Sequence, residues 1–376
     1  MVTSRIVLFF VFAVVVVVSF VVGSMPVSAE LRSGADGDLA VGRERFHSLQ
    51  GDVSPVRQGG VPGKPIAAGS DAGLEQIQQV CSEAATDYAL SALVTENFVL
   101  LHCGNDQWAA STGNHLERTY ERFHKLFKES DFSLKPLDCR LTWICFGNTE
   151  DYYGYAWQTE RRDVSALEGY YSAQTNRVAL YETSPAPSMP ASPAAGAVVT
   201  ASASEPLGAG PALLDSARST HEAAHQLAFN TGLQRRGVMY PFWLSEGLAT
   251  AFEDDPADPM SALEVSERRR RLLDARAVNA LIPFGEFSVM SRIPMDDMGR
   301  VYDGYAQAWG FYTFLFENHR SELSHYFAHL QSLAPGRRSA ERMRREFADS
   351  FGALRPLEKQ WTEYLDSLER AAGNQG

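Results

Sequence analysis

The stretch THEAAHQLAFNTGL at positions 220–233 contains two histidines four residues apart, His221 and His225. Pro211 favours a helix start before it, apolar residues follow at steps of three and four, and Gly232 favours a helix end. On such a helix both imidazoles project from one face, one turn apart, where they can hold one metal ion. The fold must therefore bring a further ligand to this face.

A second helix that could supply this ligand is predicted from the stretch PFWLSEGLATAFED at 241–254. Glu246 follows His225 after twenty intervening residues, and a short connection would let the two helices face each other. A hydrolytic zinc site usually has three protein ligands and leaves its fourth position to water. Glu222, offset by about 100° from His221 on the helix, is placed to act as a general base on that water. The predicted cofactor is therefore Zn²⁺.

These residues could also have ordinary structural roles that involve no metal. His221 and His225 could be ordinary histidines of an amphipathic helix, and Glu246 could be a carboxylate near a helix N-terminus. The three acids at 253–255 lie further along the chain, where we expect a solvated helix end. The arginines at 268–271 are expected on a solvated helix face. The combination of two histidines, an adjacent glutamate and a distant glutamate favours the metal site.

The arrangement HEAAH followed by WLSEGLATAFE resembles the gluzincin branch of the zinc metallopeptidases, which includes thermolysin and the aminopeptidase N type enzymes. More closely, it is similar to a family of exported bacterial proteins of uncharacterised function with a peptidase-like gluzincin domain, over about 98–365. The resemblance implies that His221, His225 and Glu246 bind zinc. It also implies that Glu222 is the general base.

The resemblance has further implications. Aminopeptidase-type gluzincins use a downstream tyrosine, and Tyr305 in YAQAWGFYTFL lies in the matching pattern, with Tyr302 three residues earlier able to share its face. The segment NRVALYE at 176–182 resembles the edge strand beside the cleft, which could pair with an extended peptide. Thermolysin-like enzymes have an acidic residue four positions after the zinc glutamate, where this chain has Thr250. The exopeptidase motif that binds a free amine is also missing, so an endopeptidase or a restricted peptidase is favoured.

These observations predict an exported zinc metallopeptidase whose partner is a peptide or protein substrate. In this hypothesis Glu222 takes a proton from a zinc-bound water, and Tyr305 with zinc stabilises the oxyanion. The alternative is a catalytically inactive gluzincin-fold binding module of the cell envelope, which has no chemical need for Glu222. A structural zinc scaffold is disfavoured, because such sites usually close all four positions with Cys and His.

The N-terminus is typical of an export signal. Arg5 precedes an apolar run at 6–22, and Pro26 and a small-residue triplet ending at Ala29 follow, as in a signal peptide that is removed. An uncleaved anchor is the alternative, and only in that case is a membrane a partner. The rest of the chain is expected in the periplasm, the cell envelope or the extracellular space. A net charge of −12 argues against nucleic acid as a partner.

The predicted fold is α+β and zincin-like, with a small mixed or antiparallel sheet before a mainly helical part. The expected divisions of the chain are a signal peptide at 1–29, a flexible tether at 30–74, an α/β subdomain at 75–182, a Pro/Ala/Ser/Gly-rich insertion at 183–212 and a helical zinc-binding catalytic subdomain at 213–376.

Within the α/β part, helices are predicted at 75–89 and from a capping box at 114–117 to about Lys128. Strands are predicted at 96–104 and 137–146, with a short helix after Thr149 and a hairpin at 170–182 that turns near Asn176. Cys139 and Cys145 would lie about 20 Å apart on one strand, too far for a disulfide. If bridged, each pairs with Cys81 or Cys103; buried thiols are the alternative.

Overall fold

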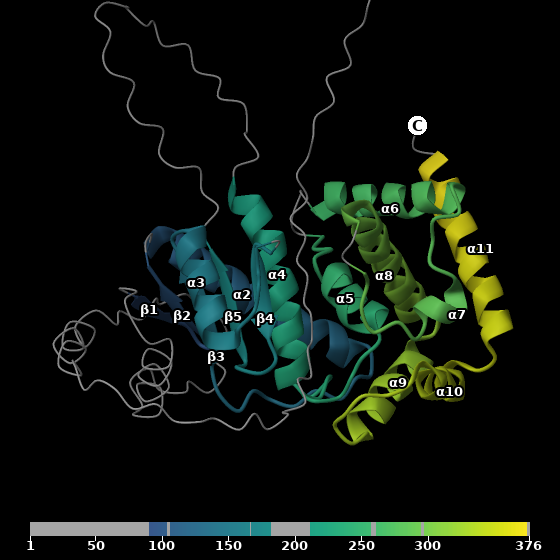
Figure 1. The fold of residues 1–376 in the computed structure, drawn as a ribbon, viewed down its shortest axis with the longest axis horizontal. Coiled ribbons are helices and arrows are strands. Elements are labelled where there is room, and N and C mark those ends of the chain that lie inside the picture. Colours follow the sequence, from purple (N-terminus) through teal and green to yellow (C-terminus); the bar gives the residue numbers. More distant parts are fainter. Residues whose placement is uncertain are drawn as a thin grey trace, which may run out of the picture.

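The computed structural model describes residues 90–103, 106–165, 167–181, 211–256, 261–294 and 297–373. The expected signal peptide, the tether, the helix at 75–89, Cys81 and nearly all of the insertion at 183–212 lie outside these residues. The described part has the predicted α+β fold, in which a five-stranded sheet precedes a mainly helical region (Figure 1). Among the described residues, no helix is both long and apolar enough to cross a membrane.

The sheet has the strand order β1-β2-β3-β5-β4, and its three inner strands run parallel while each outer strand is antiparallel to its neighbour. The strands are β1 Ser91–Val94, β2 Phe98–His102, β3 Leu141–Phe146, β4 Gly169–Ser172 and β5 Arg177–Tyr181. Every residue of β2 and β3 is buried. The strand predicted at 137–146 begins only at Leu141, because Leu141 pairs with Phe98, the first residue of β2.

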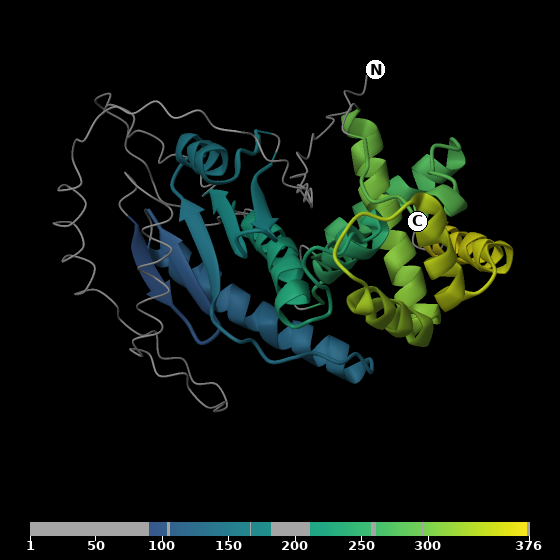
Figure 2. The same cartoon turned by 60° about the horizontal axis from the view of Figure 1, so that its bottom comes forward.

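Helices cover both faces of the sheet, which explains the continuous apolar strands (Figure 2). On one side, α3 (Thr149–Glu160) packs against the sheet, with the ring centroids of Phe146 and Tyr155 5.4 Å apart. On the other side, α4 (Pro211–Asn230) packs against it, with Tyr171 stacked on Phe229 at 5.7 Å. Next to α4 lies α2.

The helix α2 (Asp106–Glu129) contains the helix predicted up to about Lys128, and Leu116, Phe123 and Phe127 are buried along it. Its predicted start is wrong. Asn114 lies inside the helix rather than at its N-terminus, since helical residues already begin at Asp106. The polar residues that resemble a capping box are therefore part of a helix interior.

The hairpin of β4 and β5 turns at Asn176 as predicted, with a left-handed φ of 58° at that residue. The prediction that 176–182 forms the edge strand is wrong. β5 pairs with β3 on one side and with β4 on the other, so both of its edges are occupied. The edge strand at this end of the sheet is β4, which contacts α4.

The helical region is arranged around α8, which contacts α5, α6, α9 and α11 (Figure 1). Its helices are α5 Phe242–Phe252, α6 Ser261–Ala277, α7 Phe284–Phe287, α8 Met298–Asn318, α9 Arg320–Ser332, α10 Ala340–Phe351 and α11 Leu354–Gly373. Aromatic packing joins them: the indole of Trp243 on α5 lies 5.0 Å from Phe311 on α8 and 6.0 Å from Phe347 on α10. Cys103, Cys139 and Cys145 form no disulfide with one another.

Candidate metal centre

Two helices, α4 and α5, bring His221, His225 and Glu246 together. Their ligand atoms all lie within 4.8 Å of one another, and all three residues are buried. The Nε2 atoms of the two histidines are 3.2 Å apart. Glu246 Oε2 lies 3.4 Å from His221 Nε2 and 3.5 Å from His225 Nε2. Three donor atoms that converge on one point form a group that could bind a metal ion, and the described residues contain no second such group.

The position of α4 on the sheet is fixed by Gln226, which follows His225 and is fully buried. Its side-chain oxygen accepts a hydrogen bond from Trp143 Nε1 at 2.8 Å. Its amide nitrogen donates to the carbonyl oxygens of Asn176 at 3.0 Å and Thr142 at 3.3 Å. Because consecutive helical residues point about 100° apart, this anchor leaves the two histidines free to face α5.

The position of α5 depends on its close contact with α8. Gly247 lies where the two helices meet, and a Cβ atom on it would be 2.4 Å from the Ala308 carbonyl oxygen. The absence of a side chain lets the helices approach and brings Glu246 next to Tyr305 on α8. At the start of α5, Trp243 Nε1 donates to the Ser288 carbonyl oxygen at 3.0 Å.

The charges of the triad favour a bound proton or cation between its side chains. Burial opposes ionisation of Glu246, but the neighbouring imidazoles of His225 and His221 outweigh it and lower the pKa of Glu246 to about 2. Burial likewise opposes the charged form of His221, but hydrogen bonds to Glu246 and Glu253 raise the pKa of His221 to about 10. A metal cation would take the place of the proton that these groups share, so its binding would release protons.

Glu253 contacts the triad, although the sequence predicts it at a solvated helix end. Its Oε1 lies 2.6 Å from His221 Nδ1, and its side chain is only 13% exposed, so it does not belong to a solvated helix end. Partners of this kind orient a histidine ligand. Thr250 stands where thermolysin-like enzymes have an acidic partner for a zinc histidine. In this chain Glu253, three residues later, contacts His221 instead. The signal in the sequence was the spacing of seven residues from Glu246, which is two helical turns and therefore the same helix face.

Glu222 and Tyr305 lie beside the triad with unsatisfied polar atoms. Glu222 is fully buried, and within the described residues neither carboxylate oxygen has a hydrogen-bond partner of normal geometry. Burial raises the pKa of Glu222, although the two histidines and the Tyr171 backbone of β4 favour its charged form. The buried Tyr305 hydroxyl makes no hydrogen bond of normal geometry within the described residues, although it interacts with the Glu246 carboxylate. Burial raises its pKa well above the usual value, and the nearby Glu246 and Glu222 carboxylates raise it further.

Buried polar atoms without partners are candidates for contact with a ligand or a water, above all where they lie next to possible metal ligands. The predicted residues Glu222 and Tyr305 therefore both lie beside the triad. Tyr302 has a different environment, because the Arg271 guanidinium lies 4.9 Å from the centre of its ring. Of the two tyrosines, Tyr305 is the one beside the triad.

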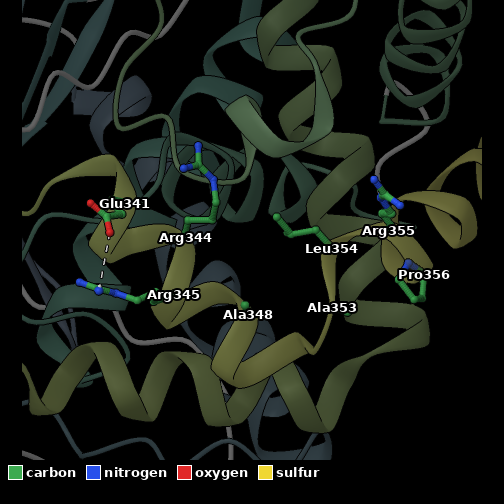
Figure 3. Close-up of a pocket in the computed structure, with 8 residues that line it drawn as sticks. All are labelled: Glu341, Arg344, Arg345, Ala348, Ala353, Leu354, Arg355 and Pro356. Atoms are coloured by element: carbon green, nitrogen blue, oxygen red, sulfur yellow. Dashed lines mark ion pairs between the residues drawn. The ribbon is translucent and has the colours of Figure 1, made fainter.

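A groove far along the chain from the triad lies between α10 and α11 (Figure 3). In Figure 3 an ion pair joins Glu341 and Arg345 on one side, and apolar side chains form much of the remaining wall. The groove is lined by Glu341, Arg344, Arg345, Ala348, Ala353, Leu354, Arg355 and Pro356. None of these residues belongs to the metal triad, so the groove adds nothing to its chemistry.

The fold and the site define an α+β protein with a buried His-His-Glu centre that could bind a metal ion. Residues 215–335 match a family described as a protein of unknown function (DUF1570). The match covers less than half of the chain and contains the triad, Glu222, Glu253 and Tyr305. No curated protein matches the chain.

Proposed function

We propose that this protein is an exported zinc metallopeptidase of the gluzincin type. The observation that carries the proposal is the fully buried Glu222 carboxylate, whose oxygens make no hydrogen bond of normal geometry within the described residues, next to three buried metal-ligand side chains. A carboxylate that only stabilised the fold would be expected to have hydrogen-bond partners. Two neutral imidazoles and one carboxylate are a common ligand set for hydrolytic zinc.

The residues of the chain divide the chemistry between them. His221, His225 and Glu246 would hold the zinc ion, which when bound activates a water molecule and polarises the substrate carbonyl. Glu222 accepts a proton from that water and passes it to the leaving nitrogen. The Tyr305 hydroxyl donates a hydrogen bond to the oxygen on which negative charge develops.

The edge strand β4 supports a peptide as the substrate. This strand is the last one in the sheet, and its residue Tyr171 lies near Glu222. An extended peptide that adds to this edge by main-chain hydrogen bonds would bring its carbonyl groups past the general base. Main-chain pairing requires no free terminus, which agrees with an endopeptidase.

The test compares the parent with Glu222→Gln, which keeps the size of the side chain and removes its basicity. Both proteins are loaded with zinc and incubated with a denatured protein and a mixed peptide pool, and the products are identified by mass spectrometry. We expect equal zinc content and a loss of hydrolysis by a factor of about 10² to 10⁴ in the variant. The exposed Glu341→Gln on α10 is the matched control and should behave as the parent. Equal hydrolysis by Glu222→Gln would refute the proposed role.

A further inference from the structure

Arg268 on α6 lies among three carboxylates close to the metal triad. Its Nη1 is 2.5 Å from Asp254 Oδ1, its Nη2 is 3.2 Å from Glu264 Oε2, and Nη2 also pairs with Glu253 Oε2. The Arg268 side chain is only 11% exposed. The prediction that 268–271 lies on a solvated helix face is therefore wrong for Arg268, which contacts the end of α5, and for the partly buried Arg271, which pairs with Asp303 on α8.

Glu253 connects this arginine to the triad by using its two oxygens for different partners. Oε1 lies 2.6 Å from His221 Nδ1, and Oε2 pairs with Arg268. A histidine that donates its Nδ1 proton to a carboxylate presents the lone pair of Nε2, which in His221 points toward His225 and Glu246. The orientation of the Glu253 carboxylate thus decides which nitrogen of His221 is available to a metal.

The Arg268 guanidinium also binds Asp254, which has a second partner of its own. Asp254 binds Arg268 through Oδ1 and accepts a hydrogen bond from Trp309 Nε1 through Oδ2 at 2.8 Å. Trp309 lies on α8, one turn after Tyr305. Arg122 of α2 donates to the carbonyl oxygens of Phe252 and Asp254, the latter at 3.1 Å, and so holds the backbone on which both acids lie.

We propose that Arg268 is a positioning residue of the metal centre, which holds Glu253 in the orientation that fixes His221 as an Nε2 ligand. The inference rests on the proposed function for the identity of the metal. A planar guanidinium can bind two carboxylates at fixed angles, whereas a lysine ammonium at the same place is a point charge without this geometry. Without Arg268, Glu253 would have one partner instead of two and could turn away from His221.

The test measures the zinc dissociation constant by competition with a chromogenic chelator, which requires no substrate. Arg268→Lys retains the charge, and we expect it to weaken zinc binding by about tenfold, the lower end of the range for partners of metal-bound histidines. Glu253→Gln should weaken it by about 10-fold to 100-fold. In the double variant, Arg268→Lys should add little further loss, because its effect is transmitted through Glu253.

A second buried arginine provides the matched control. Arg338 is 3% exposed, pairs with Glu346 and donates to the Met239 carbonyl oxygen, and none of these residues belongs to the triad. Arg338→Lys should lower thermal stability and leave the zinc dissociation constant unchanged. If Arg268→Lys does not fold, Asp254→Asn, which frees the far side of the guanidinium, is expected to weaken zinc binding several-fold.

Three results would overturn the inference. The first is a parental zinc dissociation constant in Arg268→Lys, or in Asp254→Asn if that variant replaces it. The second is that Arg268→Lys weakens zinc binding as much in the Glu253→Gln background as it does alone, and the third is that Arg338→Lys weakens zinc binding as much as Arg268→Lys does. Each would show that Arg268 stabilises the fold without acting through Glu253. These results leave the proposed function intact, since the parent still binds zinc. A parent that binds no zinc would refute both proposals, and hydrolysis that does not depend on Glu222 would refute the proposed function alone.

Discussion

Replacement of Gly247 by alanine tests how the packing of α5 on α8 produces the metal centre. An alanine Cβ at this position would lie 2.4 Å from the Ala308 carbonyl oxygen, 3.0 Å from its carbonyl carbon and 2.8 Å from Tyr312 Cβ. Ordinary van der Waals contact begins at 3.4 Å, so the closest approach is too short by 1.0 Å. The obstructing atoms are backbone atoms and a Cβ, none of which can move by a side-chain rotation. The helix α5 must therefore shift away from α8.

The expected cost follows from two opposing effects. Overpacking of this kind typically costs about 1 to 3 kcal/mol. Alanine is a better helix residue than glycine by about 1 kcal/mol, which offsets part of this cost. We therefore expect the free energy of unfolding to fall by up to about 2 kcal/mol. Because Gly247 follows Glu246 directly, the same shift displaces the carboxylate relative to His221 and His225 and should weaken metal binding.

Urea unfolding of the metal-free protein measures the first effect, and chelator competition measures the second. Gly285→Ala on α7 is the matched control, because its Cβ would have no neighbouring atom within 4 Å. It should be neutral or slightly stabilising and should leave metal affinity unchanged. Parental stability together with parental metal affinity in Gly247→Ala would refute the idea that this contact positions Glu246.

Two further predictions concern the supports of the site. Gln226→Leu should lower the free energy of unfolding by about 1 to 3 kcal/mol, because the buried Trp143 Nε1 would lose its acceptor; an unchanged urea midpoint would contradict this. Burial raises the pKa of Asp254 from 3.8 to about 6, although the Arg268 guanidinium and the Trp309 indole N–H lower it. The folded state therefore binds more protons than the unfolded state between these values, so this carboxyl's contribution to stability is present at low pH and is lost as pH rises through about 6. Asp254→Asn should remove a decline of at most about 3 kcal/mol between pH 4 and 7, and equal slopes in both proteins would argue against it.

Features that depend on local spacing could be predicted from the sequence. The four-residue step between His221 and His225, and the apolar pattern around Glu246, define two amphipathic helices whose polar side chains must meet. The hairpin turn at Asn176 has a similarly local cause, because asparagine tolerates a left-handed φ. These elements contain the whole triad, so the candidate metal centre was accessible from the sequence alone.

Features that depend on distant packing could not be predicted. The run at 268–271 is uniform in sequence, and only the packing of α6 decides that Arg268 reaches Glu253 and Asp254 while Arg270 stays exposed. Glu253 lies 32 residues from His221, and its spacing from Glu246 indicates a shared helix face but not this contact. The two arms of the hairpin are both apolar, and their order in the sheet depends on pairing of β5 with β3, which follows from no property of the hairpin itself. The spatial order of the elements therefore does not follow from local sequence patterns.

The most direct test of the account is the zinc content per chain of the purified protein, measured by elemental mass spectrometry beside Glu246→Ala. We predict about one tightly held zinc ion per parent chain and clearly weaker retention in the variant, because the triad supplies three protein ligands. A folded parent that retains no zinc even after zinc is supplied would contradict the central claim and favour a binding module without metal chemistry.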